Sequence, residues 1–411
     1  MGPGADGRVR YVFRRRIVRW LVAAHDRCGE LLWRVSGGPL ERPPAHICAV
    51  VLNQIGDAVM ALPTIDALSE MCPESRISVV AGQGVAALLR NRAWKAEVHG
   101  FDALWQRVVR ELRPERTSWT EVWGSVRGFV ALMRMLAPDA ALLFQPDPIA
   151  TYVVSLVGVT HTFGFVEAGA GFRLRHPVST PPVGHQVERL FALARAFAAA
   201  LGVDAPRPEP PRLDPDRTLV EQVLARLAVS GVDPARTVVV HPFASAETKN
   251  WSVDRWHAVA RWLEAHGFVP VVVGGPHDAV DALGVRARID GRMSLPELAA
   301  LLGVARLFVG VDSGPAHVAA AVGCPVISVF SSVNDVHRWR PYGGWAPVSV
   351  LHHPPADRVR FPYERRRLPP GTAGNPYTDG IEVDDVIREI ERLVGQATRP
   401  SRPPGPDRQH P

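Results

Sequence analysis

One pattern constrains the fold more than any other, and it occurs twice along the chain. A short, unbroken apolar run rich in β-branched residues is followed at once by a helical pattern. Residues 46–53 read HICAVVLN, and residues 237–241 read TVVVH. Runs of this length without polar alternation predict strands buried on both faces, as in parallel sheets. Because such strands alternate with helices, we expect right-handed βαβ units and two α/β domains.

A proline-rich polar segment separates the two series. Residues 203–215 read VDAPRPEPPRLDP, a composition that suits an interdomain linker and fits neither sheet. We therefore expect a basic helix with a linker (1–44), an N-terminal domain (45–205), a hinge (206–216), a C-terminal domain (217–380), a final helix (381–396) and a disordered tail (397–411). Further strands are expected at 76–81, 95–101, 139–144, 160–166, 270–273, 307–311 and 325–330, and one long helix at 185–201. Residues 354–380 are expected to be irregular.

Composition excludes several classes of protein. The apolar share of 46% and the charged share of 21% are typical of a folded globular protein. The formal charge of +6 is modest and concentrated in the first forty residues, so we predict no nucleic-acid partner. Four cysteines occur without a C-x-x-C or a zinc-like spacing, which indicates a reducing, cytoplasmic environment. No apolar run is long enough to span a bilayer.

The N-terminal segment 8–34 carries an amphipathic helical pattern with an arginine-rich face. Val9, Phe13, Ile17 and Trp20 fall on one arc. A basic helix with a tryptophan can lie on an anionic membrane, which would place the protein on the inner face of the cytoplasmic membrane. It can equally pack on the domain that follows, and both interpretations stay open.

The first candidate site lies where the strand at 46–53 turns into a helix. Gly56 permits a tight turn and close backbone approach, and Asp57 follows at the helix start. Asp57 could cap the helix, which its position alone favours. It could also act as a general base for an acceptor hydroxyl. No G-x-G-x-x-G fingerprint follows this first strand, and the sequence contains no Walker phosphate loop.

The second candidate site follows the strand at 237–241. The loop offers the hydroxyl of Ser245 and then Lys249, whose ammonium group suits a phosphate. The alternative is an exposed loop lysine with no ligand. Lysine is scarce in a chain whose basic residues are mostly arginine, and this favours a role for Lys249.

The third candidate site is the segment Asp312-Ser313-Gly314-Pro315-Ala316-His317, where an apolar strand meets a helix. Ser313 and Gly314 would leave backbone amides at the helix N-terminus, which can hold a diphosphate. Asp312 would face sugar hydroxyls or orient Ser313, and His317 could bond a phosphate oxygen. Simple capping and a satisfied buried histidine are the alternatives. No metal site is apparent, because the only D-x-D string, 214–216, lies in the hinge.

Together the three segments resemble glycosyltransferase family 9, the ADP-heptose:lipopolysaccharide heptosyltransferases. The resemblance is carried by Gly56-Asp57 with Pro63, the H-P-x-A-S and K-x-W segments at 241–251, the G-G-P turn at 274–276, the D-S-G-P-x-H segment at 312–317 and Gly323 to Pro325. It covers residues 46–350. It implies a GT-B fold of two Rossmann-like parallel-sheet domains facing a central cleft, and a metal-independent inverting transfer from an ADP-sugar, without a further cofactor.

The resemblance also implies roles for individual residues. Asp57 would be the catalytic base, and Lys249 would stabilise the departing diphosphate. The donor-binding set would comprise Gly56, Ser245, Asp278, Asp312, Ser313, Gly314 and His317. Some members place a glutamate after the glycine turn to hold the ribose, and here Asp278 or His277 would have to serve. The partners would be a nucleotide-sugar donor and a glycan or glycolipid acceptor.

Two other functions remain open from the sequence. One is a different GT-B enzyme, either another sugar transferase or a nucleotide-sugar epimerase. The other is a non-catalytic nucleotide-sugar-binding protein held at the membrane. The presence of both Asp57 and Lys249 favours an enzyme.

Overall fold

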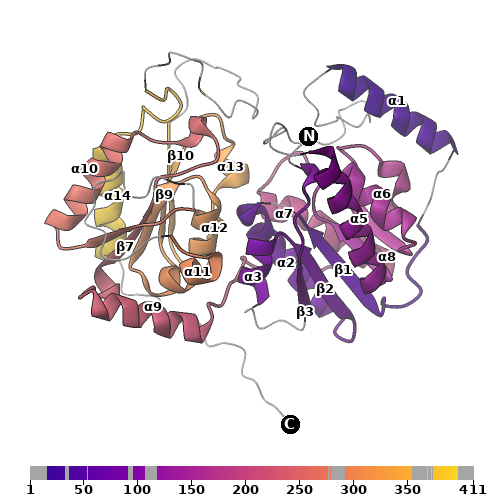
Figure 1. Ribbon diagram of the computed structural model, residues 1–411, viewed down its shortest axis with the longest axis horizontal. Coiled ribbons are helices and arrows are strands. Elements are labelled where there is room, and N and C mark those ends of the chain that lie inside the picture. Colours follow the sequence, from indigo (N-terminus) through magenta and orange to yellow (C-terminus); the bar gives the residue numbers. More distant parts are fainter. Residues whose placement is uncertain are drawn as a thin grey trace, which may run out of the picture. The chain divides into compact units, whose positions relative to one another are not determined.

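The computed structural model divides the chain into two compact units. The N-terminal unit contains Met1–Asp216 with two later segments, Ser294–Ala299 and His337–Tyr342, and the C-terminal unit contains the remainder. Figure 1 colours the chain from one end to the other. The structure describes residues 16–32, 37–52, 54–90, 96–106, 118–275, 278, 292–353, 368, 372 and 374–396.

The N-terminal unit is built on a six-stranded parallel sheet in the order β3-β2-β1-β4-β5-β6. Ile47 of β1 pairs with Ile77 on one side and Ala140 on the other, so the first strand lies in the middle of the sheet. All six residues of β1 are buried, as a continuous apolar run requires. The strands are β1 (His46–Val51), β2 (Arg76–Ala81), β3 (Ala96–Gly100), β4 (Ala140–Leu143), β5 (His161–Phe165) and β6 (His176–Val178).

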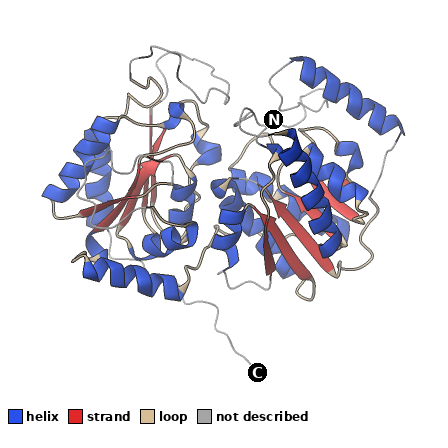
Figure 2. Cartoon of the chain, in the orientation of Figure 1, coloured by secondary structure: helices blue, strands red, loops and turns tan. Residues whose placement is uncertain are grey.

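Helices cover both faces of this sheet (Figure 2). They are α2 (Ile55–Met71), α3 (Gln83–Arg90), α5 (Trp119–Leu136), α6 (Pro148–Leu156), α7 (Gln186–Leu190) and α8 (Ala192–Leu201), with the 3₁₀ turn η2 (Gly171–Arg173). One core cluster joins Val50 and Leu143 of the sheet to Phe129 and Met133 of α5 and Val153 of α6. This packing places α5 and α6 on the same face, where they contact each other.

The C-terminal unit repeats the plan with a five-stranded parallel sheet in the order β11-β10-β9-β7-β8. Its strands are β7 (Thr237–His241), β8 (Val269–Val272), β9 (Leu307–Val311), β10 (Val326–Phe330) and β11 (Val348–His352). The helices of this half of the chain are α9 (Arg217–Val229), α10 (Val253–Ala265), α11 (Leu295–Val304), α12 (Gly314–Ala321), α13 (Val336–Trp339) and α14 (Val383–Gln396), with the 3₁₀ turns η3 (Pro234–Arg236) and η4 (Glu247–Lys249). The first half of α11 and nearly all of α13 belong to the segments that group with the N-terminal unit.

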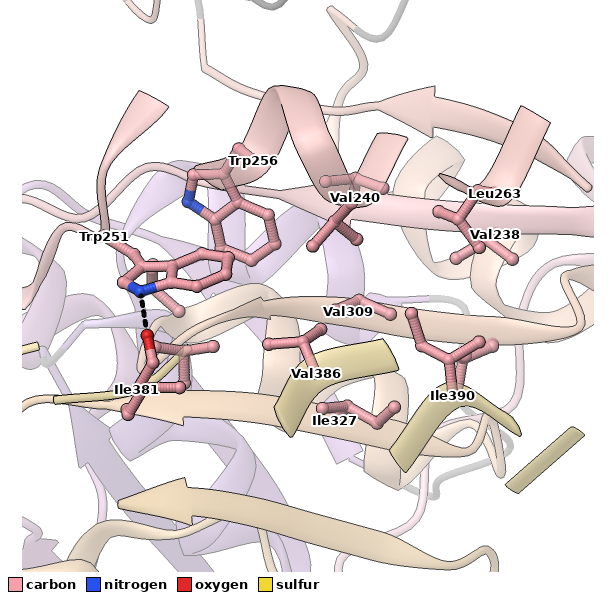
Figure 3. Close-up of a cluster of buried hydrophobic side chains, with 14 of the residues drawn as sticks. Val238, Val240, Trp251, Trp256, Leu263, Val309, Ile327, Ile381, Val386 and Ile390 are labelled. Atoms are coloured by element: carbon pink, nitrogen blue, oxygen red, sulfur yellow. Dashed lines mark hydrogen bonds between the residues drawn. The ribbon is translucent and has the colours of Figure 1, made fainter. Parts of the chain in front are cut away.

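The core of the C-terminal unit lies between this sheet and helices α10 and α14 (Figure 3). Trp251 and Trp256 meet edge to face, with ring centroids 5.0 Å apart. The indole N–H of Trp251 donates to the carbonyl of Ile381 at 3.0 Å, just before α14 begins. The last helix is therefore part of this core and fixes the loop that carries Trp251.

The strand and helix predictions agree closely with the structure in most places. The strands at 76–81, 237–241 and 307–311 have the predicted bounds. Ser294 and Glu297 form the expected capping box, and Gly267 ends α10 with a φ of 79°. The helix expected at 185–201 was wrong as a single element, because α7 and α8 meet at Phe191. The strands β6 and β11 were not predicted from sequence.

The N-terminal helix α1 (Arg16–Leu32) packs on the N-terminal unit through its second half. Asp26 is buried, and its carboxylate accepts the amide of Ala170 at 2.9 Å. His25 lies against the ring of Phe172, with centroids 5.3 Å apart. Packing thus accounts for this half of the helix, while residues 8–15 of the predicted basic segment lie outside the described residues. Among the helices described, none is long and apolar enough to cross a bilayer.

Candidate functional site

Three loops of the C-terminal unit meet at one edge of its sheet. Strands β10, β9 and β7 are neighbours and parallel, so the segments that follow them emerge side by side. Those segments carry Asn334, Asp312 and Lys249, respectively. We call these three residues the donor-edge cluster.

An ion pair forms the centre of the donor-edge cluster. The Nζ atom of Lys249 lies 2.8 Å from Oδ2 of Asp312. The Asp312 side chain is 5% exposed and that of Lys249 is 23% exposed. The side-chain amide of Asn334 donates to the same Asp312 oxygen. Because the carboxylate is buried and held from two sides, it fixes the direction of the lysine, which keeps a solvent-accessible surface.

The Lys249 loop is held by the residues that follow it. Asn250 accepts the amide of Ala244 on its Oδ1 at 2.8 Å, which closes the loop between strand and lysine. Its own carbonyl accepts hydrogen bonds from Asn375 at 2.6 Å and Thr378 at 2.9 Å. Trp251, 3% exposed, anchors the other end in the core. The K-x-W pattern therefore places a charge on a rigid support.

The helix α12 begins at this same edge. Ser313 is its N-cap residue, yet the serine side chain makes no capping hydrogen bond. Its Oγ is buried and has no hydrogen-bond partner among the described residues. Gly314 and Pro315 form the first turn. The helix end thus offers its backbone amides and an unused hydroxyl, a combination that suits an anion or a sugar. The capping alternative for Asp312 and Ser313 does not describe this geometry.

Two histidines are buried near the donor-edge cluster. His241 ends β7, and its Nδ1–H donates to the carbonyl of Val273 at 2.9 Å. Burial lowers the pKa of His241 below its ordinary value, so the ring stays neutral. His317 is buried in the first half of α12. Gly310, in β9, lies against the backbone of His241, where a Cβ would come within 2.7 Å of the carbonyl oxygen.

The remaining predicted donor residues lie in the loops after β7 and β8. Ser245 is exposed in the β7 loop. Asp278 accepts the amide of Gly275 on its Oδ2 at 2.7 Å and acts electrostatically on His241, which places it near the same strand end. His277 lies outside the described residues.

Gly56 and Asp57 belong to the N-terminal unit, in the first turn of α2. The N-cap position is held by Gln54, whose side chain makes no capping hydrogen bond. Asp57 is therefore the third helical residue and not the N-cap residue. That it helps to cap the helix and that it acts as a general base both stay predictions. Its side chain is half-buried, and Gly56 is buried. A carboxylate in the first turn of a helix is favoured by the helix dipole.

One residue of the donor-edge cluster, Asn334, was not predicted from sequence. It follows the last predicted strand by four residues, in a run reading SSVN. The only sequence signal for Asn334 was a polar run at the carboxyl end of a buried strand, and this run matches no recognised binding motif. Within the described ranges, no group of three or more histidine, cysteine or acidic side chains has metal-binding geometry.

Comparison with known proteins identifies the family of this chain. The model of glycosyltransferase family 9 (heptosyltransferase) matches residues 132–361, more than half of the 411 residues. That region includes the donor-edge cluster and begins after Asp57.

Individual relatives match over different lengths. Lipopolysaccharide heptosyltransferase 3 of Escherichia coli is 31% identical over 172 residues, which are 39% of this chain and 48% of that protein. The chain thus spans about half the length of this relative. The lipopolysaccharide core heptosyltransferase OpsX of Haemophilus influenzae is 24% identical over 85% of this chain and 97% of that protein.

A solved structure shares the fold over nearly its whole length. The E. coli heptosyltransferase WaaC with ADP superposes with a TM-score of 0.62 at 19% identity, covering 85% of this chain and 99% of that one. The two parallel-sheet α/β domains are therefore of the GT-B type. With the family model matched over most of the C-terminal unit's sheet, the chain belongs to glycosyltransferase family 9, the heptosyltransferase family.

Proposed function

We propose that the protein transfers a heptose from ADP-heptose to a glycan of the lipopolysaccharide core, with inversion and without a metal ion. The observation that carries this proposal is the Lys249–Asp312 ion pair beside the open N-terminus of α12. Family membership and the names of the relatives support heptosyl transfer, and the ADP bound by WaaC supports an adenine nucleotide donor.

On the donor side, the diphosphate would bind at the amides of Ser313 and Gly314, beside the Ser313 hydroxyl. Lys249 would approach the phosphate that becomes the leaving group while Asp312 and Asn334 hold it in place. As the bond between the anomeric carbon and the phosphate oxygen breaks, negative charge develops on ADP. A fixed ammonium group and a helix end stabilise this charge without reorganising.

The remaining predicted donor residues would surround the nucleotide and sugar. Asp278 lies after β8, and its Oδ2 accepts the amide of Gly275. Its other carboxylate oxygen would accept a hydrogen bond from a ribose hydroxyl. His317 and Ser245 would add hydrogen bonds to the diphosphate or sugar, and Gly56 would let substrate approach the backbone.

On the acceptor side, Asp57 would remove the proton from the attacking hydroxyl. The hydroxyl oxygen then forms a bond to the anomeric carbon as ADP leaves from the opposite face, which inverts that centre. A carboxylate base of this kind contributes about 10²–10⁴-fold to the rate. No divalent ion enters this scheme, because Lys249 and the end of α12 balance the diphosphate charge.

The direct test is a transfer assay with ADP-heptose and a heptose-deficient lipopolysaccharide core glycan. We expect ADP release and a product heavier by one heptose, with turnover unchanged by EDTA. UDP- and GDP-sugars serve as donor controls. Consumption of a UDP-sugar in place of ADP-heptose would overturn the donor assignment. Conversion of the donor into its epimer, without transfer to the acceptor, would indicate an epimerase.

A second test separates an enzyme from a silent binding protein. Asp57→Asn should lower the rate of transfer by about 10²–10⁴-fold and leave ADP affinity unchanged, whereas Lys249→Ala should weaken ADP binding. If Asp57→Asn turns over at the wild-type rate, the mechanism is wrong. The proposed location is the cytoplasm, at the inner face of the cytoplasmic membrane where a lipid-linked acceptor would be reached.

A further inference from the structure

Helix α5 of the N-terminal unit exposes two tryptophans that the proposed chemistry does not use. Trp119 is 68% exposed and Trp123 is 62% exposed. Tryptophan is among the most buried residue types on average, so an exposed pair one turn apart points to an interaction surface. Other tryptophans of the same unit can be buried, as Trp105 is at 1% exposure.

The same side of α5 carries positive charge. Arg127 follows Trp123 by one turn and Arg134 lies two turns further, and both are exposed. The single acid of the helix, Glu121, is bound to the hydroxyl and amide of Ser118 in the capping box. The outward surface is therefore aromatic and basic. We call Trp119, Trp123, Arg127 and Arg134 the α5 surface.

The opposite side of α5 packs in the core of the N-terminal unit. Val122, Phe129, Met133 and Leu136 are buried there against the sheet and α6. Because these residues hold the helix, the outward tryptophans are not needed for packing. A role outside the monomer's own core explains them better.

The tryptophan end of α5 lies at the edge of the sheet that also carries Asp57. Ser125, in the second turn of α5, donates to the carbonyl of Asp102 at 3.0 Å and accepts the amide of Leu104 at 3.1 Å. Residues 102–104 lie in the loop after β3, and Asp57 lies in the first turn of α2, the helix that follows β1 of the same parallel sheet. Both features therefore stand at the carboxyl edge of the strands.

We propose that the α5 surface docks on an anionic phospholipid bilayer. Indole rings favour the membrane–water interface, where the ring is apolar and its N–H remains hydrated. Guanidinium groups on the same stripe are complementary to lipid phosphates. Such docking would present the Asp57 edge to a lipid-linked acceptor, a consequence that rests on the proposed function, whereas the docking itself does not.

The test measures binding of the full-length protein to vesicles, without donor or acceptor. Phosphatidylcholine vesicles are compared with vesicles that also contain phosphatidylglycerol, by co-sedimentation. We expect binding only to the anionic vesicles. Trp119→Ser with Trp123→Ser should weaken it about tenfold, and Arg127→Gln with Arg134→Gln should weaken it several-fold and reduce its salt dependence.

Matched controls come from the C-terminal unit. Val229→Ser removes a side chain that is 91% exposed, and Arg261→Gln removes an exposed arginine of α10. Both should bind as wild type, and circular dichroism with a thermal melt should show that all variants are folded. Removal of residues 1–36 separates any contribution of α1 from that of α5.

Three outcomes would overturn the proposal: the tryptophan variant binds anionic vesicles like wild type, removal of residues 1–36 alone abolishes binding, or sedimentation velocity shows a dimer that the tryptophan variant loses. Failure of vesicle binding would leave heptosyl transfer to a soluble core glycan intact. Conversely, absence of transfer with vesicle binding retained would reject the proposed function and keep the docking surface.

Discussion

The carboxyl edges of the two sheets carry different kinds of site. In the C-terminal unit, loops after three adjacent strands converge, and Lys249 and Asn334 both bond the carboxylate of Asp312. In the N-terminal unit, the predicted catalytic residue is a single half-buried carboxylate, Asp57, in the first turn of α2. The first edge contains a buried ion pair, in which Asp312 fixes a cation. At the second edge the buried carboxylate of Asp147 accepts hydrogen bonds from the neutral side chains of Trp105 and Gln106, and Asp57 is the predicted base.

This difference follows from what each edge is proposed to bind. A diphosphate requires fixed positive charge and oriented backbone amides. Burying a charged group costs desolvation free energy, so neighbouring residues must hold it in place. Removal of a proton from a hydroxyl requires one carboxylate within hydrogen-bond reach. The comparison predicts that substitutions at the donor edge change binding and stability, while substitution of Asp57 changes the rate alone.

The largest expected effect is that of Asp57→Asn on turnover. We expect kcat to fall by about 10²–10⁴-fold, because the amide cannot accept the proton. The dissociation constant for ADP, measured by calorimetry, should stay within about twofold of wild type. Asp66→Asn, a neighbour on the same helix, serves as the control. A large loss of ADP affinity in Asp57→Asn would contradict the proposal that the two edges have separate roles in binding and in catalysis.

The next effect concerns the support of the donor edge. Trp251→Ala should lower the free energy of unfolding by about 3–5 kcal/mol, because it empties a buried site and removes the hydrogen bond to Ile381. ADP affinity should fall as well, since Lys249 loses its anchor. Trp123→Ala removes an exposed ring and should change stability by less than about 0.5 kcal/mol. Chemical denaturation measures both, and equal effects would contradict the assignment.

Asn334→Leu tests the residue that the sequence did not reveal. Loss of the amide that bonds Asp312 should weaken ADP binding about tenfold, since a hydrogen bond to a buried charge contributes about 1.5–3 kcal/mol. Val333→Ala, the preceding residue, is the control. Unchanged ADP affinity in Asn334→Leu would show that Lys249 alone orients Asp312.

The smallest expected effect is on the pH dependence of stability, and it distinguishes the amino-terminal edges of the two sheets. His46, His161 and His176 begin strands of the N-terminal sheet, while none of the C-terminal strands described begins with histidine. Burial, with the charges of His161 and Arg175, lowers the pKa of His176 from 6.5 to about 4. As pH falls below 6.5 the unfolded chain takes up the proton first, so the free energy of unfolding decreases until about pH 4.

Because His176 is partly exposed, we expect its share of this loss to be about 1 kcal/mol. His176→Phe should flatten the pH dependence of the unfolding free energy between these limits, and its ring can keep the stacking on Phe163. His337→Gln, an exposed site, should leave the profile unchanged. Identical profiles for His176→Phe and wild type would show that this histidine is not responsible.

Most of the fold could be predicted because its signals are local. Continuous apolar strands such as 237–241 and 307–311 have matching bounds in the structure, since burial on both faces leaves no polar position to blur them. The helix at 185–201 was predicted in one piece because every residue of the run, including Phe191, suits a helix. β6 was missed because it has only three residues, and one of them is Pro177.

The sequence by itself determined the doubled α/β plan and the identity of the residues at each strand end. Hydrophobic periodicity and the glycine and proline residues that end each element depend only on residues close together in the chain. Only the tertiary structure decided which of these residues meet. Asp312 and Asn334 are separated by 22 positions, and Lys249 by 63 from Asp312, yet strand order brings all three together. Which strands become neighbours depends on packing over the whole sheet, and no local pattern encodes that choice.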